Sequence, residues 1–151
     1  MPEKETLERA KEDKREGKAA STQAGEFVRE EIEHVREGKH GARSTKQAIA
    51  IGLSKARRAG VKLPPPEKGT VTEATREQAK RDTKKGQSGA RSRTSTTRSR
   101  ASSRALKREG HSAASKTALS RQARGAAARR SAAFRSRSAK KAAATRKRQE
   151  A

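Results

Sequence analysis

Large apolar side chains are few, and most of them lie in one part of the chain. Leu, Ile, Val and Phe together occupy 14 of the 151 positions, and nine of these fall between Phe27 and Leu63. From about Ser21 to Glu37 the apolar positions recur every three or four residues, which is typical of one face of an α-helix. This face comprises Ala24, Phe27, Val28, Ile32 and Val35. We expect this helix to end at Gly38, because glycine is favoured just after a helix.

Two further helices are predicted on either side of this one. Residues 3–16 form a charged run between Pro2 and Gly17, and the acidic side chains at its start suit the helix dipole. Ser44 and Gln47 match a capping box, which predicts a third helix ending at Gly60. The apolar face of this third helix comprises Ala48, Ile49, Gly52, Leu53, Ala56 and Ala59.

A short β-strand is the alternative for part of the third helix. Ile49, Ile51 and Leu53 alternate with Ala50 and Gly52, which is the periodicity of a strand. The capping box and the alanine content favour the helix. In a helix, Ile51 falls outside the apolar face, so we expect it to be exposed and available to a partner.

The chain changes character after residue 63. Pro64, Pro65 and Pro66 cannot continue a helix, and beyond them we expect only a marginal polar helix near residues 72–85. The predicted division is a charged N-terminal helix (residues 1–20), a helical module (residues 21–63), a Pro-rich and then Ser/Thr/Arg-rich linker (residues 64–104) and an Ala/Arg/Lys-rich basic tail (residues 105–151).

The expected fold class is mainly α, with a small helical N-terminal module followed by a long, largely disordered basic tail. The tail has almost no apolar surface to bury, and its like charges repel one another. Alanine favours helix, but we expect the tail to become partly helical only when phosphates neutralise its charge.

Positive charge is concentrated in the second half of the chain. The net charge is +23, and residues 87–151 alone hold 19 basic and 2 acidic side chains. There is no cysteine, which excludes disulfides and thiolate metal sites. No apolar run has the length of a membrane span or a signal-peptide core, so we expect a soluble, intracellular protein.

Enzymatic chemistry finds little support in the sequence. The histidines are His34, His40 and His111. Gly38 lies between the first two and Gly41 follows them, so this pair has no fixed helical spacing and we expect no metal site. Gly17-Lys18 and Gly38-Lys39 lack the spacing of a phosphate-binding loop. Four glutamates follow one face of the second helix, and without a pocket we expect them to form a solvated acidic face: Glu26, Glu30, Glu33 and Glu37. No catalytic residue and no cofactor are predicted.

Residues 21–66 resemble a segment shared by a family of small, basic bacterial proteins of uncharacterised function. The most distinctive portion is KQAIAIGLSKARRAG, from Lys46 to Gly60. Members of that family are often labelled DNA-binding proteins, and the resemblance implies no catalytic residue, cofactor or structure. Separately, the tail is similar in composition to the Ala/Lys/Arg-rich tails of bacterial histone-H1-like proteins.

Electrostatics therefore carry the functional prediction. Densely spaced cations neutralise phosphates without sequence preference, and arginine binds phosphate oxygens with two donors at once. We expect a non-enzymatic, nucleoid-associated protein that grips duplex DNA with its tail in the bacterial cytoplasm. The linker and tail residues predicted to contact nucleic acid are Arg91, Arg93, Arg98, Arg100, Arg104, Arg121, Arg124, Arg129, Arg130, Arg135, Arg137, Lys140, Lys141, Arg146, Lys147 and Arg148.

Other modes of binding remain open at this point. The second and third helices resemble a helix-turn-helix in outline, although their turn is longer than that motif uses. The second helix of such a motif would present Arg43, Lys46, Gln47, Arg57 and Arg58 to DNA. An RNA- or ribosome-associated protein would use the same tail, because Arg/Ser runs also suit RNA backbones. A third class is an adaptor whose helical module binds a protein, and no small-molecule substrate is predicted.

Overall fold

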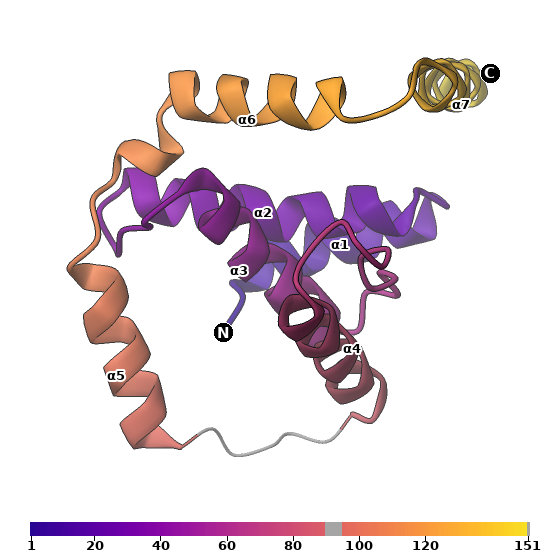
Figure 1. Cartoon of the computed structure of the whole chain (residues 1–151). Coiled ribbons are helices and arrows are strands. Elements are labelled where there is room, and N and C mark those ends of the chain that lie inside the picture. Colours follow the sequence, from indigo (N-terminus) through magenta and orange to yellow (C-terminus); the bar gives the residue numbers. More distant parts are fainter. Residues whose placement is uncertain (90–94, 151) are drawn as a thin grey trace. The chain divides into compact units, whose positions relative to one another are not determined.

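The computed structural model describes residues 1–89 and 95–150 (Figure 1). Within these residues the chain forms seven α-helices, α1–α7, and one short 3-10 turn, η1. The chain divides into two compact units, Met1–Ser115 (unit 1) and Lys116–Ala151 (unit 2), and each is described by itself. None of the helices in the described ranges has an apolar stretch that could cross a membrane.

The three helices predicted for the first sixty residues are present. They are α1 (Lys4–Arg15), α2 (Ala20–Arg36) and α3 (Thr45–Arg58). Gly17, Gly38 and Gly60 follow them with φ values of 71°, 74° and 92°, a left-handed conformation that glycine adopts without steric cost. Because α3 is helical throughout, the strand alternative is excluded. Ile51 is half-buried and not exposed, which corrects that expectation.

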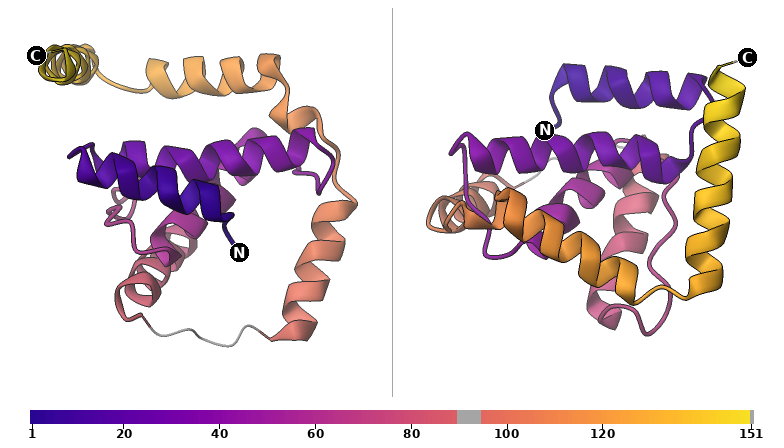
Figure 2. Two further views of the ribbon diagram at one scale, coloured as in Figure 1. Left: turned by 180° about the vertical axis from the view of Figure 1, so that it is seen from behind. Right: turned by 90° about the horizontal axis from the view of Figure 1, so that it is seen from above.

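Helices α1 and α2 lie side by side in opposite directions (Figure 2). The backbone N–H of Glu3 donates to Glu30 Oε2 at 3.1 Å. About two turns further along α1, Arg9 Nε donates to Glu26 Oε2 at 2.6 Å. Charged and polar side chains therefore make much of the contact in this pair, which explains how a helix as polar as α1 is held in place.

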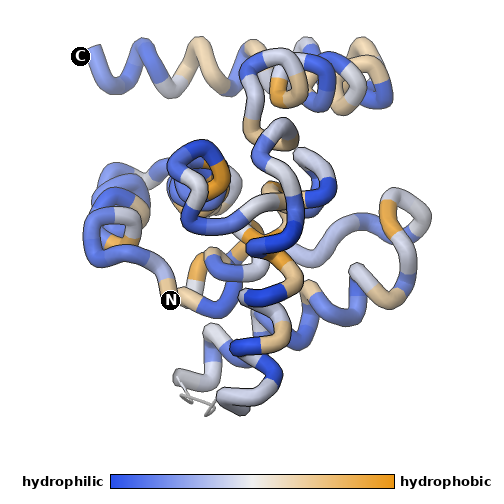
Figure 3. Tube along the Cα trace, turned by 90° about the vertical axis from the view of Figure 1, so that its left-hand side faces the viewer, coloured by the Kyte–Doolittle hydropathy of each residue, from blue (hydrophilic) through white to orange (hydrophobic). Residues whose placement is uncertain are grey.

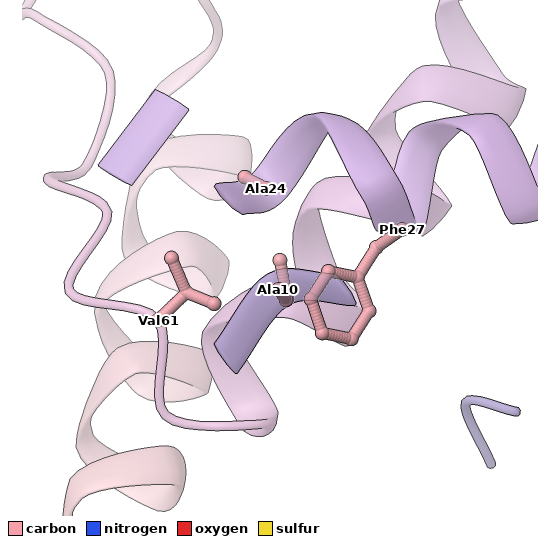
Figure 4. Packing of buried hydrophobic residues seen from close by; sticks show 5 residues of the cluster. Ala10, Ala24, Phe27 and Val61 are labelled. Carbon is pink, nitrogen blue, oxygen red and sulfur yellow. The ribbon is translucent and has the colours of Figure 1, made fainter. Parts of the chain in front are cut away.

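The apolar core of unit 1 is small. Its largest side chain is Phe27, which is 1% exposed. The cluster around Phe27 comprises Ala10, Ala24, Ala56 and Val61 (Figure 4). Helices α2 and α3 approach closely because Gly52 has no side chain: a Cβ there would lie 2.7 Å from Val28 Cα. Small residues thus bring the backbones together where large apolar side chains are scarce.

Helix α4 (Glu73–Gln87) packs against the C-terminal half of α3. Asp82 is 1% exposed and accepts hydrogen bonds from Ser54 Oγ at 2.6 Å and Arg58 Nε at 2.8 Å. Gly86 permits the close approach, because a Cβ there would lie 1.9 Å from a backbone carbonyl oxygen of α3. This polar helix, marginal by itself, is stabilised by a buried carboxylate and not by apolar surface.

The expectation of a long, largely disordered basic tail is wrong. The described residues after 94 form α5 (Thr96–Lys107), η1 (Ser112–Ala114), α6 (Lys116–Ala128) and α7 (Ala132–Gln149). Serines cap two of these helices: Ser95 Oγ accepts from the Arg98 N–H, and Ser131 Oγ accepts from the Phe134 N–H. The helix propensity of alanine, together with these caps, outweighs the repulsion between cations.

The last turn of α5 and the stretch that follows it are anchored on α2, α3 and the loop between them. Two backbone N–H groups of the α2–α3 loop donate to the carbonyls of residues 106 and 110, at 2.9 and 3.0 Å. In η1, Ala113 and Ala114 are buried, and their carbonyls accept from Thr45 Oγ1 and Arg36 Nε. Residues up to Ser115 therefore belong to the folded first unit.

Unit 2 has no core of its own. Neither α6 nor α7 contains a buried residue. Phe134 is 43% exposed, and the Arg130 guanidinium lies 5.3 Å from the centre of its ring. Coloured by hydropathy, the chain is mainly hydrophilic, with apolar residues confined to short stretches (Figure 3). The side chains of unit 2 are consequently available to solvent or to a ligand.

Candidate nucleic-acid interface

Unit 2 carries a dense set of exposed cations. It holds twelve Lys or Arg side chains and one acidic side chain, and all twelve cations are exposed. Among the described residues, none of the twelve forms an ion pair with a carboxylate. The predicted site residues that lie here are Arg121, Arg124, Arg129, Arg130, Arg135, Arg137, Lys140, Lys141, Arg146, Lys147 and Arg148. Their charge is therefore not neutralised within the described chain.

The cations of α7 are spread around the helix. At about 3.6 residues per turn, they form three groups at different positions around the helix axis. The groups are Arg135 with Arg146, Lys140 with Lys147, and Arg137 with Lys141 and Arg148. No single face of α7 is distinguished by charge. Such a helix can meet a phosphate backbone from several sides, which suits binding without a fixed register.

Helix α6 has a more defined basic face. Lys116, Arg121 and Arg124 line a shallow surface depression together with the hydroxyl-bearing Thr117 and Ser120. Ammonium, guanidinium and hydroxyl groups are all donors to phosphate oxygens. This face therefore combines charge with neutral hydrogen-bond donors.

Helix α5, in unit 1, also presents cations. Arg98, Arg100 and Arg104 are exposed, and Arg100, Arg104 and Lys107 are spaced four and three residues apart, so that they share a face. Sequence reasoning missed three exposed cations, Lys107, Arg108 and Lys116, although their charge and low-complexity surroundings match those of their neighbours. Arg91 and Arg93 lie outside the described residues.

The cations predicted on the helical module are not equally available. Arg43 and Lys46 are exposed at the start of α3. Arg58 donates to the buried Asp82. Arg57 is 6% exposed and donates to the Pro64 carbonyl, and burial lowers the pKa of this guanidinium. Arg57 is therefore removed from the candidate interface, whereas the Arg58 side chain is 55% exposed and is shared with Asp82.

The predicted acidic face of α2 is also corrected. Glu30 is 2% exposed and accepts from Lys55 Nζ at 3.2 Å. Burial acts to raise the pKa of Glu30, but hydrogen bonds from Thr6, the Glu3 N–H and Lys55 hold that pKa below its ordinary value. The other three glutamates pair with basic side chains, namely Glu26 with Arg9, Glu33 with Arg29 and Glu37 with Lys39. The face is engaged within unit 1 and is not simply solvated.

Comparison with known protein families finds a match for one segment of the chain. The model of a family of unknown function (DUF6496) matches residues 11–68, a span that includes α2 and α3. The resemblance to an uncharacterised family is thereby confirmed, whereas neither a DNA-binding activity nor a histone-H1-like tail is supported by the comparisons. No curated protein and no solved structure matches the chain. Over residues 11–68, then, this chain is similar to a protein family of unknown function.

Proposed function

We propose that this protein binds duplex DNA through its phosphate backbone, with little sequence preference and without catalysing a reaction. The observation that carries the proposal is the set of twelve exposed cations of unit 2, none of which is paired with an acid in the described residues. Exposed α5 cations extend the same chemistry. Such binding would make the protein nucleoid-associated.

The energetic basis is the release of counterions from DNA. Each phosphate that a cation neutralises frees bound counterions, so affinity falls as salt concentration rises. Helices α6 and α7 bury no side chain of their own, and their cations therefore reach phosphates without rearrangement of a core. Neutralising these cations also relieves their mutual repulsion, so binding and helix stability reinforce each other.

The chain offers little for recognition of unstacked bases. Proteins that bind single strands stack bases on aromatic rings, but the chain contains no Trp or Tyr and two Phe residues. Phe27 is buried in the core, and Phe134 contacts the Arg130 guanidinium. This composition favours duplex DNA over single-stranded nucleic acid.

The proposal is tested by removing exposed cations from unit 2 and an equal number of paired cations from unit 1. The test variant carries Arg135→Gln, Arg137→Gln, Lys140→Gln and Lys141→Gln. The control variant carries Arg15→Gln, Arg29→Gln, Arg76→Gln and Lys80→Gln, whose side chains pair with glutamates. Both variants lose the same net charge, and glutamine keeps a helix propensity close to that of Lys and Arg.

Affinity for a duplex of mixed sequence is measured against salt concentration. For the test variant we expect a loss of at least tenfold and a shallower salt dependence, by about 0.9 per phosphate contact removed. For the control variant we expect less than a threefold loss. Equal losses would show that only net charge matters and would contradict the proposed interface.

A structured RNA competitor separates the RNA-associated alternative. If RNA displaces the duplex only at a large molar excess, duplex DNA is the preferred ligand. If RNA displaces it at equal concentration or below, the protein is RNA-associated and the DNA proposal is wrong.

A further inference from the structure

Two of the three histidines come together at the C-terminal end of α2. His34 lies in the last turn of α2, and His40 lies in the loop that follows it. The left-handed conformation of Gly38 turns the chain back between them. The two rings are 6.0 Å apart between centroids and nearly perpendicular. Gly38 thus brings the two rings together by a turn, without the fixed spacing that one continuous helix would give them.

Glu31 completes a compact group with the two histidines. It lies one turn before His34 on α2, and its side chain is 1% exposed. Glu31 Oε1 is 3.1 Å from His40 Nε2. One potential ligand atom from each of Glu31, His34 and His40 lies within 4.8 Å of the other two. This is a set of one carboxylate and two imidazoles, the donor types that zinc binds.

Hydrogen bonds already orient both rings as metal-binding histidines are oriented. His40 Nδ1 donates to the Gly41 carbonyl at 3.0 Å, and His34 Nε2 donates to Glu3 Oε1 at 2.9 Å. Histidines that bind a metal through one ring nitrogen usually donate the other N–H to a carbonyl or carboxylate. Both rings fit that pattern, which leaves His40 Nε2 and His34 Nδ1 as the candidate ligand atoms.

The contact between His40 and Glu31 calls for a positive charge. When His40 Nδ1 carries the only ring proton, Nε2 is an acceptor that faces the carboxylate oxygen of Glu31 at 3.1 Å. Two acceptors at this distance repel unless a proton or a metal ion lies between them. Ligand atoms about 2.0–2.2 Å from zinc are about 3.3 Å apart at the tetrahedral angle, so the observed separation suits a bridging ion.

We propose that Glu31, His34 and His40 bind one divalent transition-metal ion, with Zn²⁺ the best match to this donor set. Small rotations of the side chains bring the three ligand atoms to bonding distance, and water takes the fourth position. The ion ties the α2–α3 loop to α2. Because the same loop donates hydrogen bonds to the stretch after α5, the ion stabilises that attachment as well.

Two lysines share the carboxylates of this site. Lys55 Nζ lies 2.6 Å from Glu31 Oε2, and Lys39 Nζ lies 3.2 Å from Glu3 Oε1. Lys55 engages the oxygen that does not face His40, so Glu31 remains free to bind the ion through Oε1. The positive charge of both lysines moderates the affinity, and we expect binding weaker than at a site with unpaired carboxylates.

The test is metal binding by the full chain, prepared without a polyhistidine tag and freed of metal with a chelator. Zn²⁺ affinity is measured by competition with a chromogenic chelator, and Co²⁺ is added separately to read the coordination geometry from its visible spectrum. We expect one equivalent of metal and the absorption of tetrahedral Co²⁺. His34→Gln and His40→Gln should each weaken Zn²⁺ binding by at least tenfold.

The remaining histidine provides the control. His111 is exposed and is not a member of the group, so His111→Gln should keep the affinity within twofold of the parent chain. Far-UV circular dichroism confirms that each variant is folded. If either ligand variant fails to fold, Glu3→Gln serves in its place and should weaken binding by about tenfold, because the carboxylate charge that orients the His34 ring and raises its basicity is lost. Absence of stoichiometric binding, or equal losses in His111→Gln and the ligand variants, would overturn the proposal.

Discussion

The two units of this protein use charge in opposite ways. In unit 1, acidic side chains are drawn inward and paired, as for Glu30 with Lys55 and Asp82 with Arg58. In unit 2, twelve cations are exposed and a single acid is present. Paired charges help to give unit 1 a defined tertiary structure on a small core. In unit 2 the cations have no acidic partners within the described chain, so they are available to a ligand.

This difference shows that composition alone does not decide whether a basic chain folds. The whole chain is poor in large apolar residues, yet unit 1 buries Phe27 among alanines and closes its helices with glycines. Buried carboxylates supply specific contacts that a larger apolar core would otherwise provide.

The largest effect is expected from Asp82→Ala. Asp82 accepts from Ser54 and Arg58 while 1% exposed, so its loss leaves these donors unpaired and opens the contact between α3 and α4. We expect a loss of about 3 kcal/mol in the free energy of unfolding, measured with urea, because the hydrogen bonds from Ser54, Arg58 and Gln78 are all lost. Glu73→Ala, which removes an exposed partner of Arg76, should cost less than about 1 kcal/mol. Similar losses in both variants would mean that burial of Asp82 is not what stabilises unit 1.

Alanine at two helical glycines should have opposite effects in the two units. A Cβ at Gly52 would lie 2.7 Å from the α2 backbone, whereas a Cβ at Gly125 in α6 meets only a side-chain atom at 3.7 Å. Gly52→Ala should therefore destabilise unit 1 by about 2 kcal/mol in urea unfolding. Gly125→Ala should stabilise α6 locally by up to about 1 kcal/mol, measured as the free energy of local opening in hydrogen exchange. A stabilising Gly52→Ala would contradict the close approach of α2 and α3.

Loss of a single cap should loosen unit 2 locally. Ser131 Oγ accepts the Phe134 N–H at 3.2 Å at the start of α7. Ser131→Ala should reduce protection of the first turn of α7 from hydrogen exchange by about 1 kcal/mol. Ser44→Ala removes the equivalent cap of α3, but packing against α2 should keep exchange there slow. If both substitutions reduced protection from hydrogen exchange equally, packing would not stabilise the start of α3 more than the start of α7.

The smallest effect concerns a surface ion pair on α4. A hydrogen bond from Lys80, with its positive charge, holds the pKa of Glu77 below the ordinary value of 4.5. This pair stabilises the folded chain above about pH 4.5, and its contribution is lost as the pH falls through the lowered pKa. Lys80→Gln should raise the pKa of Glu77 toward 4.5, measured by NMR titration. An unchanged pKa would show that the pair does not persist in solution.

Local signals in the sequence were sufficient for the helices of the first sixty residues. The Ser44–Gln47 capping box, the spacing of Phe27 and Val35, and the terminating glycines all act within a few residues of one another. Contacts between segments far apart in the sequence are not marked by any short-range pattern of this kind. Nothing near Ala113 and Ala114 marks them as buried, because their partners Thr45 and Arg36 are far away in the sequence.

The errors have physical causes of the same kind. Exposure of α6 and α7 was foreseen from their charge, but their helical state was not, because repulsion between cations was given more weight than alanine propensity and serine caps. Arg57 was assigned to the surface because it falls outside the apolar face of α3, but it is 6% exposed and donates to the Pro64 carbonyl. His34 and His40 have no fixed helical spacing, as their sequence indicated, and their proximity depends on the turn at Gly38 and on the loop that follows it.

The anchoring of η1 on α2 and α3 has a consequence for synthesis of the chain. Its two side-chain hydrogen bonds join residues 68 and 78 positions apart in the sequence. Helices α1 to α3 therefore leave the ribosome long before η1 exists, and during that interval the surface that Ala113 and Ala114 later cover is open. The growing chain thus spends part of its synthesis with an incomplete first unit, and folding of that unit is finished only after Ser115 has emerged.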